Sequence, residues 1–103
     1  MAIPVPYPEE LLRIAQKVVR YDEPEVTLAD LGAFLTHLMV YGSPTDVQLV
    51  ESYVPREEFR SVLANAPEGV FTLDAWVRWH ERLEITPIPP LPRRRFPDGS
   101  LGP

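Results

Sequence analysis

The stretch that decides the fold lies at residues 28–41 and reads LADLGAFLTHLMVY. Ten of these fourteen residues are apolar, and a helix that is apolar nearly all round is usually enclosed by other helices. Thr27 is expected to cap its first turn, with Asp30 as the second member of an imperfect capping box, and Gly42 is expected to end it. The sequence therefore predicts a central helix over residues 27–41.

Four more helices are predicted around this one. Apolar residues recur at helical spacing in each, as Leu11, Ile14 and Val18 do in the first. Ser43 and Thr72 have the side chains of helix N-caps. No run of residues has the alternation of a strand that anchors a sheet. The predicted fold class is all-α, a small orthogonal bundle of four to five short helices around the central apolar helix, with the outer helices at residues 8–21, 44–53, 55–64 and 73–83.

Prolines are concentrated at both ends of the chain. Of thirteen prolines, three lie within residues 1–8 and six lie within residues 87–103. Proline fixes φ and lacks an amide donor, so these ends are predicted to be extended polyproline II segments rather than helices. The predicted domain organisation is an N-terminal proline-rich arm at residues 1–8, a helical domain at residues 9–84 and a C-terminal arm, rich in proline and arginine, at residues 85–103.

Charge is divided unevenly along the chain. Residues 1–92 hold seven Lys or Arg and fourteen Asp or Glu, whereas residues 93–103 hold three Arg and one Asp. An acidic body repels a phosphate backbone, so a nucleic acid is not an expected partner. No stretch approaches the roughly 20 apolar residues that cross a bilayer, so no membrane partner is expected either.

The chain has no cysteine. A disulfide framework and a thiolate metal site are therefore excluded, and a reducing compartment suits the protein. The N-terminus has neither the basic region nor the uninterrupted apolar run of a signal peptide. A cytoplasmic location is expected.

The C-terminal arm has a recognisable binding chemistry. Residues 88–94, which read IPPLPRR, resemble the class II ligand pattern of SH3 domains, with Pro89 and Pro92 as anchors and Arg94 as the basic residue. This resemblance implies a protein partner, and Arg93 and Arg95 extend the basic end of the motif. The same arm is long enough to wrap its own domain or a second copy, and arm exchange is a simple route to a homodimer.

Two tryptophans lie on the last predicted helix. Trp76 falls on its apolar stripe and Trp79 lies beside it, which is typical of core residues. Tryptophan is also enriched at the centres of protein interfaces. Both a core position and an exposed interface position therefore remain open for this pair.

One pair of residues suggests a different function. His80 and Glu84 are one helical turn apart, and HERLE at residues 80–84 has part of the zincin pattern but lacks its second histidine. A small-molecule or metal site at His80 and Glu84 is the alternative hypothesis, although a packed His80 bonded to Glu84 or to a backbone carbonyl is the favoured interpretation. A DNA-reading helix-turn-helix centred on Gly42 ranks third, because Gln48 and Glu51 occupy positions that need apolar residues.

No catalytic motif is found in the sequence, which has no nucleophile elbow and no glycine-rich phosphate loop. We therefore expect no enzyme and no cofactor. The predicted function is that of a non-enzymatic interaction or accessory protein, which binds a protein partner or a second copy of itself. The expected contact residues are Pro89, Pro92, Arg93, Arg94 and Arg95.

Overall fold

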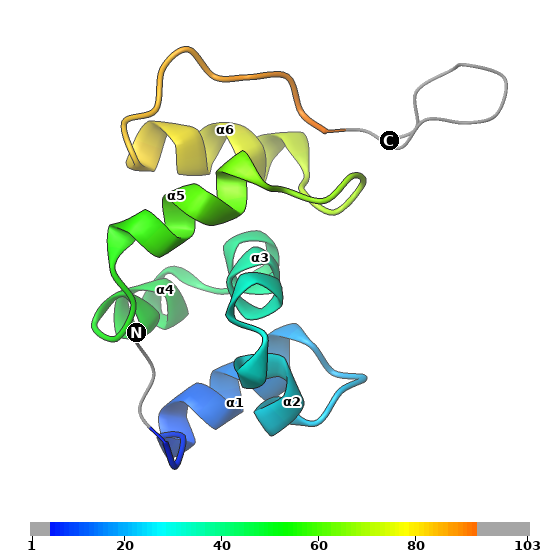
Figure 1. Ribbon diagram of the computed structural model, residues 1–103, viewed down its shortest axis with the longest axis vertical. Helices are drawn as coiled ribbons and strands as arrows, with labels where there is room; N and C mark the ends of the chain where they lie inside the picture. The colour runs from blue at the N-terminus through cyan, green and yellow to red at the C-terminus, as the bar shows by residue number, and fades with distance from the viewer. Residues whose placement is uncertain (1–4, 93–103) are drawn as a thin grey trace, which may run out of the picture.

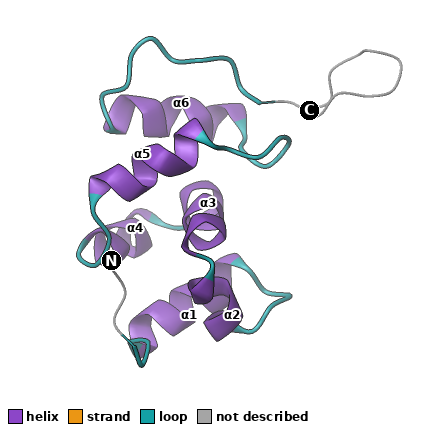
Figure 2. Ribbon diagram, in the orientation of Figure 1, coloured by secondary structure: helices purple, strands orange, loops and turns teal. Residues whose placement is uncertain are grey.

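The computed structural model describes residues 5–92, and in this part of the chain all regular secondary structure is helical (Figures 1 and 2). The prediction of an all-α fold is confirmed for these residues. The described part has six helices rather than four or five. Their bounds are α1 Glu9–Val18, α2 Pro24–Ala29, α3 Leu31–Tyr41, α4 Pro44–Glu51, α5 Arg56–Ala64 and α6 Leu73–Arg82.

The extra helix arises because the predicted helix over residues 27–41 is broken at Asp30. This residue has φ −107° and ψ 87°, and its carboxylate accepts a hydrogen bond of 3.1 Å from the amide of Ala33, so it is the N-cap of α3. Aspartate favours caps over helix interiors. Thr27, the predicted cap, lies instead within α2, which begins at Pro24 because proline suits the first position of a helix.

Helix α3 is the centre of the described structure. It contacts each of the other five helices, and Phe34, Leu35 and Leu38 on it are fully buried. Gly42 follows α3 with φ −74°, so it is not left-handed. A Cβ atom there would lie 2.7 Å from the carbonyl oxygen of Leu38. Glycine is required at this position because a larger residue would clash with the end of α3.

The other helices lie on opposite sides of α3. Figure 1 shows α1 and α2 on one side, and α5 and α6 on the other. Phe59 of α5 stacks on Trp79 of α6 with ring centroids 5.3 Å apart, and the Arg60 guanidinium donates a 3.0 Å hydrogen bond to the Leu83 carbonyl. On α4, Ser43 and Asp46 form the full capping box that caps this helix, which confirms the predicted cap.

The chain reverses direction after α6 through a Schellman motif. The amide of Ile85 donates to the His80 carbonyl at 2.9 Å, and the amide of Glu84 donates to the Glu81 carbonyl at 3.1 Å. Glu84 occupies the left-handed position of this motif, with φ 59°. Residues 85–92, which we call the strap, then run back along α6 (Figure 1).

Two hydrogen bonds and two apolar side chains attach the strap. The Trp76 indole donates to the Pro89 carbonyl at 2.8 Å, and the Gly69 amide donates to the Pro92 carbonyl at 3.3 Å. Ile85 and Leu91 pack against the core. The first eight residues of the predicted C-terminal arm therefore lie against the helical domain, while Arg93, Arg94 and Arg95 fall outside the described residues.

Candidate interaction surface

Both tryptophans that the sequence singled out are buried. Trp76 is 2% exposed and Trp79 is 3% exposed. The Trp79 indole donates a 3.0 Å hydrogen bond to the Met39 carbonyl, which joins α6 to α3. Trp76 packs edge-on against Phe71 and lies beneath the strap. Neither side chain is an exposed anchor for a partner.

His80 has a structural partner, and it is not Glu84. His80 is 1% exposed, and its Nδ1 lies 2.7 Å from the carbonyl oxygen of Trp76 in the preceding turn. Glu84 is exposed at the Schellman turn. Within residues 5–92, no group of three or more side chains is arranged to hold a metal ion. The arrangement of His80 is the packed one, with a backbone carbonyl as its partner.

The structure exposes a different set of residues, which surround an open groove of about 770 Å³. Tyr21 and Tyr41 are 78% and 65% exposed, and they line this groove together with His37. The rings of His37 and Tyr41 stack with centroids 6.2 Å apart. Tyrosines are enriched at the energetic centres of interfaces. We call this surface the aromatic groove, and its other lining residues are Lys17, Val18, Arg20, Gly69 and Val70.

Three segments that are distant in sequence build the aromatic groove. The end of α1 and the residues after it contribute Lys17, Arg20 and Tyr21, and α3 contributes His37 and Tyr41. The loop between α5 and α6 adds Gly69 and Val70. The imidazole Nδ1 of His37 lies 2.8 Å from the carbonyl oxygen of Ala33. This contact fixes the ring on the groove side of α3.

One cation of the groove is held by a buried carboxylate. The Lys17 ammonium lies 2.7 Å from an oxygen of Asp46, which is 8% exposed. Burial of Asp46 favours its neutral form, but hydrogen bonds from Lys17 and Ser43 together favour the carboxylate more, so the pKa of Asp46 is lowered from its ordinary value near 3.8. Arg20 is therefore the more available cation of the groove.

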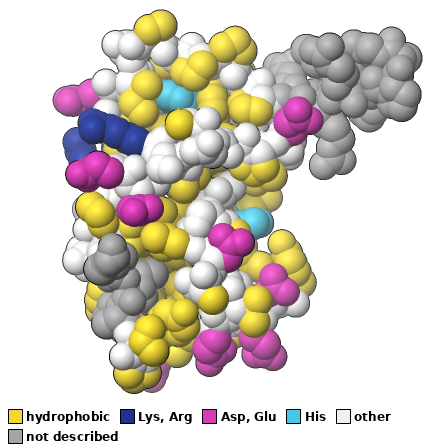
Figure 3. Space-filling model, viewed as in Figure 1, with side chains coloured by type: hydrophobic (Ala, Val, Ile, Leu, Met, Phe, Trp, Pro, Cys, Tyr) yellow, Lys and Arg dark blue, Asp and Glu magenta, His cyan; other side chains and the backbone are white. Residues whose placement is uncertain are grey.

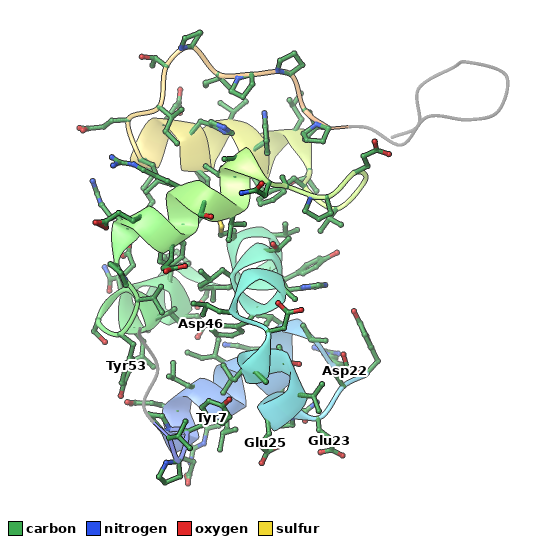
Figure 4. All side chains as sticks on the ribbon, viewed as in Figure 1. Tyr7, Asp22, Glu23, Glu25, Asp46 and Tyr53 are labelled. Atoms are coloured by element: carbon green, nitrogen blue, oxygen red, sulfur yellow. The ribbon has the colours of Figure 1, made fainter. Side chains whose placement is uncertain are left out.

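Acidic side chains follow Tyr21 in the chain. Asp22, Glu23 and Glu25 are exposed in and after the loop between α1 and α2 (Figure 4). On the face drawn in Figure 3, acidic side chains are spread widely, whereas basic ones gather near the start of α5. The groove thus combines exposed aromatic side chains and one available cation, and carboxylates lie in the loop that follows Tyr21.

The strap ends at this groove. Gly69, whose amide binds the Pro92 carbonyl, is itself a lining residue. The three arginines that the sequence singled out begin with the next residue, Arg93. The sequence analysis placed Tyr41 and His37 on the central helix and did not predict the groove. The available signal was Tyr21, a tyrosine directly before the acidic residues Asp22 and Glu23.

None of the helices within residues 5–92 is long and apolar enough to cross a membrane. No protein-family model, curated protein or solved structure matches the chain.

Proposed function

We propose that this protein is a non-enzymatic interaction protein that self-associates through the aromatic groove, with the C-terminal segment of one copy, residues 93–103, binding across the groove of another. Two observations on separate parts of the chain support this proposal. Tyr21 and Tyr41 are largely exposed on a concave surface, and the strap delivers the arginine-rich segment to the edge of that surface through the contact between Pro92 and Gly69.

The charges of the groove favour a second copy as the occupant. A two-fold interface places the same patch on both sides, so the patch has to be complementary to itself. Arg20 lies in the groove, and Asp22 and Glu23 follow it closely in the exposed loop. Two copies related by a two-fold axis can therefore pair Arg20 of each with a carboxylate of the other.

The C-terminal segment adds contacts of the same kind. Its eleven residues reach at most about 40 Å when extended, which is enough to cross from one groove to a facing one. Arg93, Arg94 and Arg95 supply charge for the carboxylates that follow Tyr21, and Phe96 supplies an aromatic ring for Tyr21 and Tyr41. In this proposal, Pro89 and Pro92 hold the start of the segment against the helical domain.

The first test addresses the exposure of Tyr21 and Tyr41, the observation on which the proposal mainly rests. Sedimentation equilibrium of the full chain across a range of concentrations is expected to show a dimer, and the variant Tyr21→Ser/Tyr41→Ser is expected to shift to monomer. The loss of two interface tyrosines raises the dissociation constant by about tenfold or more. Val5→Ser is the matched control, because Val5 is 80% exposed at the other end of the described chain.

A second variant separates the groove from the segment. Deletion of residues 93–103 leaves the groove intact and is expected to weaken the dimer in the same direction as the tyrosine variant. A full chain that stays monomeric at every concentration, or a dimer that neither change weakens, would refute self-association through this surface. A monomer in which the deletion nevertheless exposes Tyr21 to quenching would show that the segment covers its own groove instead.

A further inference from the structure

A second concavity lies between helix α6 and the turn that joins α3 to α4. It is a cleft of about 390 Å³, which is within the range of roughly 300–1,000 Å³ found for small-molecule sites. Met39, Val47 and Trp79 give it apolar walls, and Arg78 and Arg82 are the two charged residues in its lining. The cleft therefore combines apolar surface with two guanidinium groups.

The two arginines are held differently. They are one helical turn apart on α6 and both border the cleft. The Arg82 guanidinium carbon lies 5.4 Å from the centre of a Trp79 ring, and its Nη2 lies 2.6 Å from an oxygen of Glu51. Two partners thus fix Arg82 beside the indole, where it presents positive charge over an aromatic surface.

Arg78 has a partner that a ligand can replace. Its Nη1 lies 2.5 Å from an oxygen of Asp74, but the Asp74 side chain is 86% exposed. An exposed ion pair of this kind contributes little to stability, because water competes for both groups. A carboxylate or sulfonate in the cleft can take the place of Asp74 and accept paired hydrogen bonds from the guanidinium.

The surrounding charges narrow the class of ligand. Residues 5–92 hold seven Lys or Arg and fourteen Asp or Glu, so a polyanion such as a nucleic acid is repelled by the body as a whole. A bare inorganic anion leaves the apolar walls uncovered. A neutral apolar molecule covers the walls, but it removes water from the guanidinium groups and offers them no hydrogen bonds in return. This loss of hydration costs free energy.

We infer that this cleft is a binding site for a small molecule with one negative charge and a flat aromatic body, whose anionic group binds Arg78 and Arg82 and whose ring enters the cleft beside the edge of the buried Trp79. This site is separate from the aromatic groove, and its occupancy does not depend on self-association. It also differs from the His80 and Glu84 site that the sequence suggested.

The test uses 1-naphthaleneacetate as the probe and 1-naphthaleneacetamide as its neutral isostere. The indole N–H signals of the two tryptophans are followed by NMR during titration of the full chain. The Trp79 signal is expected to shift and saturate with the acid, while the Trp76 signal, on a ring that lies under the strap, stays unchanged. The amide is expected to bind at least about tenfold more weakly, as loss of a charged hydrogen bond implies.

The variant Arg78→Gln/Arg82→Gln is expected to lose the same factor of about ten for the acid and nothing for the amide. Arg13→Gln is the matched control, because Arg13 also forms an exposed pair one turn away, with Glu9 at 2.8 Å. Equal affinity for acid and amide in the full chain overturns the inference. So does a Trp79 signal that fails to saturate up to about 10 mM, or a shift of the same size at Trp76.

Discussion

Aromatic side chains are buried beneath the strap but exposed in the aromatic groove. Under the strap, Trp76 is 2% exposed, because residues 85–92 run back over α6 and cover it. In the groove, Tyr21 and Tyr41 are 78% and 65% exposed, although the covering segment ends at the edge of the same groove. Within residues 5–92, the chain therefore covers one aromatic surface with its own residues and leaves the next one exposed.

The composition of the strap explains how so short a segment can cover an indole. Four of its eight residues are prolines, which have no N–H group that needs a partner when the segment packs. Their carbonyls still accept hydrogen bonds, and those of Pro89 and Pro92 receive the Trp76 indole and the Gly69 amide. Proline also restricts the unfolded chain, so less entropy is lost when the strap packs.

The largest effect is expected from Trp76→Ala in the covered region. Removing a buried tryptophan costs about 3–5 kcal/mol, and Trp76 also loses its contact with Phe71. Urea unfolding followed by circular dichroism measures the loss. The milder Trp76→Phe keeps an aromatic ring and removes the indole donor to Pro89, at a cost of about 1 kcal/mol.

The matched change in the open region is Tyr41→Ala. Because this side chain is exposed, the free energy of unfolding is expected to change by less than about 0.5 kcal/mol. A cost for Tyr41→Ala comparable to that of Trp76→Ala, at concentrations where the protein is monomeric, would remove the distinction between the two regions.

A truncation separates the strap from the segment that follows it. Deletion of residues 86–103 is expected to cost about 2 kcal/mol of stability, through lost burial at Leu91 and the lost hydrogen bond from Trp76. It should also shift tryptophan emission to longer wavelength. At concentrations where the protein is monomeric, deletion of residues 93–103 alone keeps the strap and should leave both quantities unchanged. Equal effects of the two deletions would show that the strap is not what covers Trp76.

Salt is expected to act on the open region and not on the covered one. Each exposed ion pair of Arg93, Arg94 or Arg95 with a carboxylate contributes about 0.2–1 kcal/mol and is screened by salt. The dimer is therefore expected to weaken by up to about tenfold between roughly 0.05 and 0.5 M NaCl. The chain without residues 93–103 should weaken less with salt, because only the pairs of Arg20 remain to be screened. Sedimentation equilibrium at both salt concentrations compares the two.

A smaller effect, of opposite sign, is expected at the turn that starts the strap. Glu84 has φ 59°, a conformation that costs residues other than glycine about 1 kcal/mol. Glu84→Gly is therefore expected to stabilise the protein by about 0.5–1 kcal/mol in urea unfolding. Glu84→Ala, which keeps a Cβ atom, serves as the control and should give no such gain.

The smallest expected effect is the loss of stability in acid that depends on Asp46. The pKa of Asp46 is lowered in the folded state, so this carboxylate contributes stability above its unfolded pKa, and the contribution is lost as the pH falls through the folded pKa. Between about pH 5 and pH 3, unfolding stability should fall less in Asp46→Asn than in the wild type. The tryptophan emission of the folded protein should stay constant, because the two indole N–H groups donate to the carbonyls of Pro89 and Met39 and not to Asp46.

Much of this fold follows from the sequence, since burial imposes a helical period on apolar residues. Leu11, Ile14 and Val18 are buried as predicted, and α3 contacts every other helix. The break at Asp30 was missed, because an apolar pattern continues across an N-cap without interruption. Whether the helix breaks at Asp30 depends on whether its side chain caps a new helix or the existing helix continues through it.

The candidate site was less predictable. The prolines of the strap indicate an extended segment, but no local rule says that it packs against Trp76. The aromatic groove needs Tyr21, Tyr41 and Val70 together, and these residues come from segments that only the tertiary structure brings close. His80 was assigned to a packed position because its neighbours on the helix were apolar, and this local interpretation agrees with its observed burial.

The measurement that tests self-association through the groove most directly is the addition of a synthetic peptide of residues 93–103 to the protein that lacks them. We expect the NMR signals of Tyr21, His37, Tyr41 and Val70 to shift and saturate, while those of Trp76 beneath the strap stay in place. Peptide binding that shifts other surfaces, or no shift at any concentration up to about 1 mM, would contradict the account.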